Sequence, residues 1–178
     1  MKIDTKRLVL AALFLALCLV LPFLTGQIPQ IGSALSPMHI PVLLCGFVCG
    51  WPYGPTVGLI APFLRSLLFG MPPLFPTGVS MAFELAAYGA LTGLFYQLFP
   101  KKPPYIYVSL VLSMLAGRVV WGLVRFLIAG LQNTSFTFPM FLAGAFTNAV
   151  PGIILHLLLV PVIVLALQKA KLLPGGNA

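Results

Sequence analysis

Long apolar runs alternate with short polar links along this chain, and six runs can be distinguished. They comprise residues 8–24, 38–50, 53–69, 78–99, 105–131 and 139–168. A membrane-spanning α-helix needs about 20 apolar residues, with roughly 17 to 25 the usual range. The second run is short and rich in Pro and Gly, which leaves a partial or re-entrant helix as the alternative there. The pattern predicts an all-α integral membrane protein, a bundle of six transmembrane helices in which Pro62 and Pro151 kink their runs.

Composition agrees with the membrane class. The chain is 60% hydrophobic and 7% charged, whereas a soluble domain has roughly 25% charged residues. No shift in composition marks a second domain, so residues 1–178 are expected to form one transmembrane domain. The three cysteines all fall within apolar runs, which favours neither a disulfide framework nor a metal site. We expect no cofactor.

The basic residues predict the topology. Seven of the ten cations flank apolar runs, and all seven fall on one side: Lys2, Lys6, Arg7, Lys101, Lys102, Lys169 and Lys171. The links on the other side, residues 25–37, 70–77 and 132–138, carry no charge. Cytoplasmic loops carry the excess of Lys and Arg, so both termini are predicted to be cytoplasmic. The protein is then expected to be a multi-pass protein of the cell membrane.

Four charged residues lie inside the apolar runs: Arg65, Glu84, Arg118 and Arg125. A charge at that depth costs roughly 2.5 to 3.5 kcal/mol on insertion scales unless it faces a partner, a cavity or a ligand. At 1.5 Å per residue, Arg65, Glu84 and Arg125 reach depths of about 6 to 9 Å from the outer ends of their runs. Arg118 lies about 10 Å deeper, on the helix face that also carries Trp121 and Arg125. We therefore expect cationic side chains from separate helices to converge beneath the outer surface.

The balance of these charges favours an anionic ligand. One carboxylate cannot neutralise three guanidiniums, and arginine binds a carboxylate through its planar fork of donors. A ligand with a carboxylate or a similar acceptor group would bind the arginines that Glu84 leaves unpaired. The alternative is that Glu84 pairs with one arginine, while the others reach the interface or bond to carbonyls.

Polar residues elsewhere add to the expected pocket. Gly144, Asn148, Gly152 and His156 recur every four residues in the last run, which predicts one slightly drifting stripe on a helix. Asn148, near mid-depth, offers a donor and acceptors to a ligand, with an interhelical hydrogen bond as the alternative. His156 is interpreted as a packing or hydrogen-bonding residue. His39, near the first outer link, is expected to cap the pocket from above.

The residues that several other classes of protein need for their function are absent from this sequence. The chain has no G-x-x-x-x-G-K-[ST] phosphate loop and no H-E-x-x-H motif, and no catalytic pair has a suggestive spacing, so an enzyme is not expected. Glu84 is the sole acid within the apolar runs, whereas proton-coupled carriers usually need titratable carboxylates along their path. Small residues four apart, such as Gly54 and Gly58, predict close helix packing. Ala12 and Ala16 give the first run a small-residue face that could serve packing or docking.

The whole chain resembles a known group of membrane proteins. The resemblance rests on six spans in about 180 residues, a basic N-terminus and four blocks: Leu10-Ala11-Ala12-Leu13-Phe14-Leu15-Ala16, Pro37-Met38-His39-Ile40-Pro41-Val42-Leu43-Leu44, Pro62-Phe63-Leu64-Arg65-Ser66-Leu67-Leu68-Phe69-Gly70-Met71-Pro72-Pro73 and Met81-Ala82-Phe83-Glu84-Leu85. With these features the sequence resembles the substrate-binding S components of energy-coupling factor (ECF) vitamin transporters of prokaryotes.

The resemblance implies a function and partners. An S component binds a water-soluble vitamin near the outer face and docks on a module of one transmembrane coupling subunit and two cytoplasmic ATPases. It implies docking through Ala12 and Ala16 and a gate at residues 25–37. Surplus arginine favours a carboxylate-bearing vitamin, and pantothenate fits.

Three alternatives remain. The first is a pyridoxine-like or hydroxymethylpyrimidine-like vitamin, for which Trp121 and Tyr88 would stack and Glu84 would accept from the ligand. The second is a stand-alone secondary carrier, and the third is a structural membrane protein without a ligand.

Overall fold

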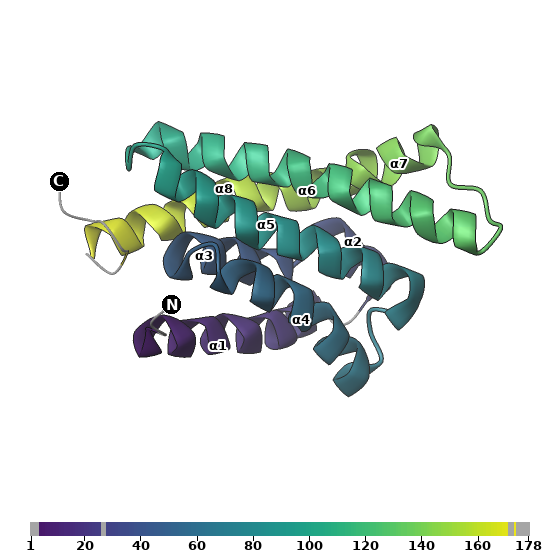
Figure 1. The fold of residues 1–178 in the computed structure, drawn as a ribbon, viewed down its shortest axis with the longest axis horizontal. Coiled ribbons are helices and arrows are strands. Elements are labelled where there is room, and N and C mark those ends of the chain that lie inside the picture. The colour runs from purple at the N-terminus through teal and green to yellow at the C-terminus, as the bar shows by residue number, and fades with distance from the viewer. Residues whose placement is uncertain (1–3, 26–27, 171–172, 174–178) are drawn as a thin grey trace.

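The computed structural model describes residues 4–25, 28–170 and 173, and its regular structure there is entirely helical. Figure 1 shows the helices lying roughly along the long axis of the molecule. In chain order they are α1 (Thr5–Val20), η1 (Leu21–Thr25), α2 (Pro29–Leu35), α3 (His39–Cys49), α4 (Tyr53–Phe69), η2 (Leu74–Gly78), α5 (Val79–Leu98), α6 (Pro103–Leu131), α7 (Phe138–Ala145), η3 (Thr147–Ala149) and α8 (Val150–Lys169).

The helical membrane class is confirmed, and the count of six spans is not. Four helical segments of the described chain are long and apolar enough to cross a membrane: Thr5–Thr25, Leu74–Leu98, Pro103–Leu131 and Phe138–Lys169. The second predicted run forms α3, whose 11 residues are all buried. At 1.5 Å per residue this helix spans only about half of a hydrocarbon core roughly 30 Å thick. It therefore serves as an interior helix surrounded by longer ones.

The last predicted run is broken, which corrects the expected stripe. The helical path ends at α7, passes through the short η3 turn and resumes as α8. Pro151 lies in the first turn of α8, so it does not kink a continuous helix. Inside a continuous helix, the Pro151 ring would clash with the carbonyl of residue 147. In the first turn of a helix there is no such clash, so proline is tolerated there. Gly144, Asn148 and His156 consequently lie on three different elements.

The first link also contains structure that its polarity did not predict. Within residues 25–37, α2 forms and packs against α8. The contact is close, because a Cβ on Gly152 of α8 would lie 2.6 Å from the carbonyl oxygen of Ala34. The predicted gate is therefore partly a helix seated on the bundle.

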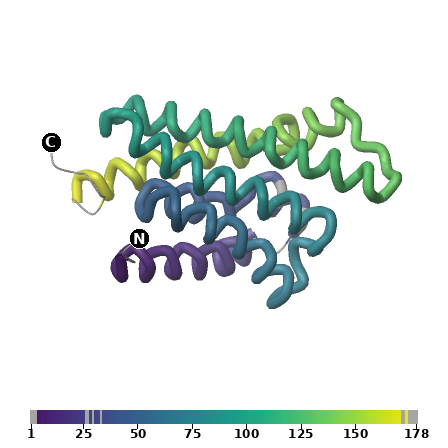
Figure 2. The backbone as a smooth tube through the Cα atoms, in the orientation of Figure 1, coloured from purple at the N-terminus to yellow at the C-terminus, as the bar shows by residue number. Residues whose placement is uncertain are grey.

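The core forms around α3, which contacts α1, α4, α5 and α8. Glycines bring α4 and α5 together, as the spacing of small residues predicted. A Cβ on Gly54 would lie 2.3 Å from the carbonyl oxygen of Gly89 across the interface. The tube in Figure 2 shows α4 and α5 running along each other. This close approach is the main packing device between helices in lipid.

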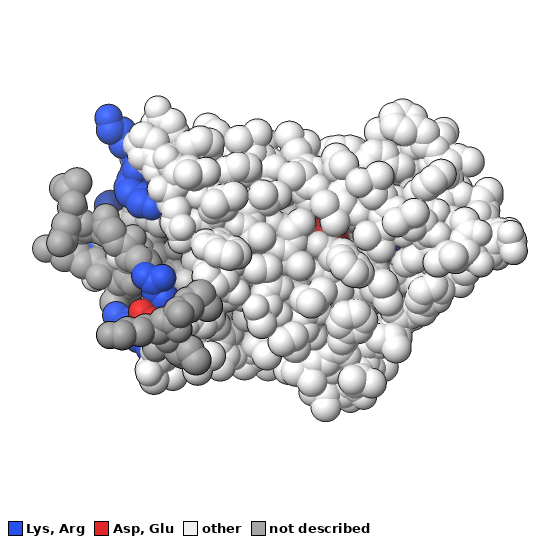
Figure 3. Space-filling model, viewed as in Figure 1, with Lys and Arg blue, Asp and Glu red and all other residues white. Residues whose placement is uncertain are grey.

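The exposed charged residues are gathered at one end of the molecule. Figure 3 shows the exposed Lys and Arg side chains clustered at the end where both termini lie. We call this the cationic end; it consists of the start of α1, the α5–α6 link and the end of α8. Lys2 and Lys171 lie outside the described residues. The asymmetry is what the positive-inside rule requires, and the cytoplasmic orientation of this end remains a prediction.

Candidate functional site

A buried ion pair between α5 and α6 forms the centre of the candidate site. Nη1 of Arg118 lies 2.9 Å from Oε1 of Glu84, and both side chains are buried. A guanidinium and a carboxylate at this distance form a charge-assisted hydrogen bond. Each charge thus stabilises the other at a depth where neither could remain alone without a large desolvation cost.

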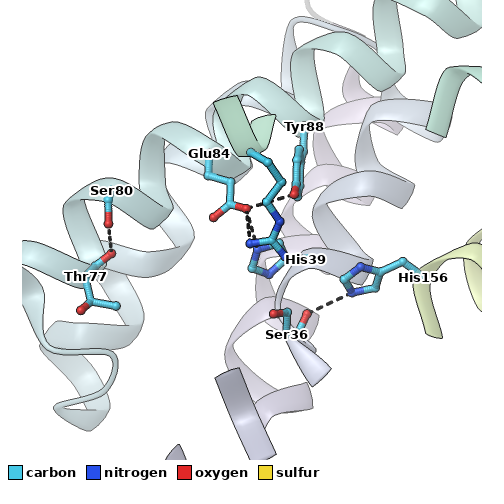
Figure 4. A network of polar contacts seen from close by, with 8 residues as sticks. Ser36, His39, Thr77, Ser80, Glu84, Tyr88 and His156 are labelled. Carbon is cyan, nitrogen blue, oxygen red and sulfur yellow. Dashed lines mark hydrogen bonds and ion pairs between the residues drawn. The ribbon is translucent and has the colours of Figure 1, made fainter. Parts of the chain in front are cut away.

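Aromatic and imidazole groups extend this pair into a cluster (Figure 4). The hydroxyl of Tyr88, one turn after Glu84 on α5, donates to Glu84 Oε1 at 3.0 Å. Nε2 of His39, at the start of α3, lies 3.7 Å from the same oxygen. The His39 ring stacks on His156 of α8, with centroids 5.8 Å apart. Nε2 of His156 lies 3.3 Å from the carbonyl oxygen of Ser36. We call this set of residues the polar cluster; its members are Ser36, His39, Glu84, Tyr88, Arg118 and His156.

The polar cluster retains unused hydrogen-bonding capacity. Both ring nitrogens of His39, Nε of Arg118 and Nδ1 of His156 are buried and have no hydrogen-bond partner within the described part of the chain. Buried polar atoms in native proteins are nearly always paired, because an unpaired one costs roughly 1 to 3 kcal/mol. The cluster is therefore chemically suited to accept a further polar group.

A cavity of about 410 Å³ lies beside the cluster, at the end opposite the cationic end. Its walls come from the first link, the end of α4, the link 70–78 and the start of α5. Met38 and Met81 line it; the first precedes His39 in sequence, and the second lies one turn before Glu84. The volume falls within the roughly 300 to 1,000 Å³ of small-molecule sites.

The link that forms one wall of the cavity is held by α5. Ser80 in the first turn of α5 donates its hydroxyl to the carbonyl oxygens of Pro76 and Thr77, each at 3.0 Å. Figure 4 shows the contact with Thr77. Thr77 itself lines the cavity, together with Pro72 and Pro73. From the sequence alone, this segment is interpreted only as a link between two runs. Its prolines are the signal for a structured wall, because proline restricts the backbone.

Arg65 is the charged residue that lines this cavity. The residue is 3% exposed, and its Nη1 donates to the carbonyl oxygen of Leu19 on α1. The guanidinium carbon lies 5.0 Å from the Phe23 ring centroid and 5.3 Å from that of Phe69, within the range of cation–π attraction. Among the described residues it forms no ion pair, because the two acidic side chains of the chain, Asp4 and Glu84, pair with other arginines.

The expected convergence of the arginines is wrong. Arg118 turns to Glu84, Arg65 lines the cavity, and Arg125 lies half-buried against aromatic rings of the α6–α7 region. Its guanidinium carbon is 5.9 Å from the Trp121 ring centroid and 5.8 Å from that of Phe136. The depths were counted from the outer ends of the runs, and these ends do not align because α6 has 29 residues and α5 has 20. Arg118, not Arg125, therefore meets Glu84.

The remaining sequence candidates fall in different places. His39 and Tyr88 belong to the polar cluster, and His39 is buried rather than a cap over the pocket. Trp121 packs against Phe141, with ring centroids 6.3 Å apart, away from the cavity walls. Asn148 is exposed in η3, at the break of the last run. Ser36 was not predicted as a site residue. It contacts His156 through its backbone carbonyl, which every residue type has, so its side chain gave no indication of this role.

Ala12 and Ala16 are exposed along one side of α1. Among the described residues, no group of three or more His, Cys, Asp or Glu side chains is arranged to hold a metal ion. Because Ala12 and Ala16 are exposed, the side of α1 that carries them is open to a further helix.

A bundle of apolar helices with a cavity and a buried cation is the architecture of a membrane-embedded binding protein. The model of the family described as "ECF transporter, substrate-specific component" matches residues 6–164. The chain therefore belongs to this family, whose members are the binding components of transporters. Neither curated proteins nor solved structures give a match.

Proposed function

We propose that this chain binds a small, carboxylate-bearing vitamin in the 410 Å³ cavity and delivers it to an ATP-driven import module. The observation that carries the proposal is Arg65, a buried guanidinium in the cavity wall without a carboxylate partner among the described residues. A ligand carboxylate would supply the missing counter-charge through charge-assisted hydrogen bonds. Arg118, already neutralised by Glu84, does not need a ligand charge.

Pantothenate is the vitamin that we propose to test first. Its carboxylate would bind Arg65, and its hydroxyl and amide groups need polar partners such as Thr77 and Gln30 in the cavity wall. The largely apolar remainder of the wall, for example Met38 and Met81, would contact its hydrocarbon part. This arrangement replaces the earlier expectation that Asn148 and Arg125 line the pocket.

A pyridoxine-like or hydroxymethylpyrimidine-like vitamin is the second candidate, because the polar cluster adjoins the cavity. His39 and Arg118 offer unpaired nitrogens there, and Glu84 could accept from a ring substituent. Such a ligand would depend on the cluster rather than on Arg65. The two candidates therefore make opposite predictions for the variants Arg65→Ala and His39→Ala: the first weakens binding of a carboxylate ligand, and the second weakens binding of a pyridoxine-like ligand.

Calorimetric titration of the purified protein with a panel of vitamins tests the proposal. Arg65→Ala is expected to weaken pantothenate binding by roughly 1.5 to 3 kcal/mol, the contribution of a hydrogen bond to a charged group. Arg125→Ala is the matched control, since it removes an arginine that does not line the cavity. Equal affinities of wild type and Arg65→Ala would exclude the carboxylate site. Binding of pyridoxine instead, lost in His39→Ala, would favour the second candidate.

Delivery to a coupling subunit and two ATPases is tested by uptake into vesicles. Ala12→Trp is expected to preserve vitamin binding and abolish ATP-dependent uptake, because a large side chain would keep a docking helix away from α1. Leu123→Trp, at an exposed position of α6, is the matched control. Uptake by this chain without ATPases would instead establish a stand-alone carrier.

A further inference from the structure

A second cavity, of about 220 Å³, opens at the cationic end, far from the proposed vitamin site. It lies between the start of α1, the end of α3, the end of α5 and the α5–α6 link. Arg7, Gln97 and Lys101 provide its polar lining. None of these residues takes part in the polar cluster or in the larger cavity.

A glycine keeps this cavity open between its polar groups. Gly50 ends α3 with φ +90°, a conformation that other residues rarely adopt. A Cβ at this position would lie 3.2 Å from Nε2 of Gln97 and 3.9 Å from Nη1 of Arg7. The absence of a side chain thus leaves room between two hydrogen-bond donors.

The two cations of the wall have donors to spare. Lys101 donates to the carbonyl oxygen of Tyr96, and its ammonium nitrogen lies 3.8 Å from the centroid of the Tyr96 ring. An ammonium has three donors, so this anchoring fixes Lys101 in the wall without exhausting it. Arg7 uses Nε on Asp4, 3.2 Å from Oδ2, which leaves its terminal nitrogens for another acceptor.

The charge balance of this cavity is positive. Among the described residues, Asp4 supplies the one acidic side chain near Arg7 and Lys101, because the other acidic residue, Glu84, belongs to the polar cluster. Burial lowers the pKa of the Lys101 ammonium, since its charged form loses contact with water. A bound anion would compensate for that loss.

We infer that the cavity lined by Arg7, Gln97 and Lys101 binds a phosphate group, supplied by the headgroup of an anionic membrane lipid. Basic pockets between transmembrane helices on the cytoplasmic side are suited to phospholipid headgroups. This cavity is such a pocket, and it lies at the end that the positive-inside rule places in the cytoplasm. A soluble phosphate compound would offer the same oxygens, so the experiment separates the two sources.

Native mass spectrometry of the full chain in a non-ionic detergent measures the binding. The probes are phosphatidylglycerol, glycerol phosphate without acyl chains, and diacylglycerol without phosphate. We expect phosphatidylglycerol to bind well and the other two weakly. Arg7→Gln and Lys101→Ala should each weaken its binding about tenfold or more, the loss expected for a charge-assisted hydrogen bond. Gln97→Leu should weaken it without any change of charge.

Lys102→Ala is the matched control, because Lys102 is exposed at the same end and does not line the cavity. It is expected to reduce binding about fivefold at most, as for a charge near an anionic surface. Equal losses in Lys102→Ala and Lys101→Ala, with none in Gln97→Leu, would show diffuse attraction and overturn the site. Equal binding of diacylglycerol would overturn it too. Equal binding of glycerol phosphate would support the phosphate site and overturn the lipid as its source.

Discussion

The two acidic side chains of this protein form two arginine pairs in contrasting surroundings. Glu84 and Arg118 lie 2.9 Å apart between α5 and α6, with side chains 3% and 9% exposed. Asp4 and Arg7 lie 3.2 Å apart at the cationic end, with side chains 52% and 36% exposed. The chemistry is the same and the distances are similar. The difference lies in whether water can solvate each charge when its partner is removed.

That difference decides what each pair can do. At the cationic end, water and salt screen the attraction, so the pair contributes little to stability and Arg7 keeps donors for another anion. In the interior, the pair is obligatory, because either charge alone would be buried without compensation. It also removes Arg118 from the arginines available to a ligand, which leaves Arg65 as the cation of the larger cavity.

The largest expected effect comes from breaking the buried pair. Glu84→Ala leaves the Arg118 guanidinium buried without a counter-charge, and the free energy of unfolding should fall by roughly 3 to 5 kcal/mol. Reversible unfolding in mixed micelles of SDS and a non-ionic detergent measures this loss. An unchanged unfolding midpoint would show that Arg118 finds another partner or reaches water.

Replacing both partners of the buried pair should recover most of that loss. Glu84→Leu combined with Arg118→Met removes both charges while keeping their volume, a change that is often neutral or even stabilising by about 1 to 4 kcal/mol relative to a buried ion pair. The same unfolding titration compares the double variant with the single one. A double variant as unstable as Glu84→Ala would attribute the loss to packing instead of charge.

A smaller effect is expected for the hydroxyl that supports the buried carboxylate. Tyr88→Phe removes the 3.0 Å hydrogen bond to Glu84, and the free energy of unfolding should fall by roughly 1.5 to 3 kcal/mol. Tyr105→Phe is the matched control at an exposed position, where a change within about 0.5 kcal/mol is expected. Equal values for the two variants would mean that the hydroxyl of Tyr88 adds nothing to the pair.

The smallest effect is expected at the exposed pair. Asp4→Asn removes the charge but keeps a good N-cap for α1, so the loss should be about 0.2 to 1 kcal/mol. Asp4→Ala also removes the hydrogen bond from the Lys6 amide, and the loss of the cap adds roughly 0.5 to 2 kcal/mol.

Added salt distinguishes the two pairs independently of mutation. The difference between wild type and Asp4→Asn should shrink as the salt concentration rises, because exposed charges are screened. The loss in Glu84→Ala should persist. A loss that responds equally to salt in both variants would end the contrast between the two regions.

Much of the fold followed from the apolar pattern. The third run, residues 53–69, coincides with α4, and the fourth and fifth runs lie within a few residues of α5 and α6. The spacing of small residues also predicted close helix packing, and the structure shows it where Gly54 meets Gly89. These features are local: burial in lipid requires an apolar helix, and close approach requires small residues, wherever the helix lies in the bundle.

The site was predicted less well, because it depends on the relative position of helices. The residue types were recognised: of the four charged residues found inside the apolar runs, Glu84, Arg65 and Arg118 are buried, and Arg125 is half-buried. Depth was counted from the outer ends of the runs, which do not align because α6 has 29 residues and α5 has 20. Counted from the α5–α6 link instead, Glu84 lies 14 residues before the end of α5 and Arg118 lies 15 residues after the start of α6, so the two reach a similar level. His39 and His156, 117 positions apart by their numbers, stack only because α3 and α8 are neighbours.

The sequence by itself determined that this protein is a helical membrane protein with its exposed cations at one end, since both follow from the cost of placing polar groups in lipid. The tertiary structure decided which charges meet, which arginine faces a cavity and where the last run breaks. Coulomb attraction and hydrogen bonding act over a few ångströms, so they depend on how the helices pack against one another.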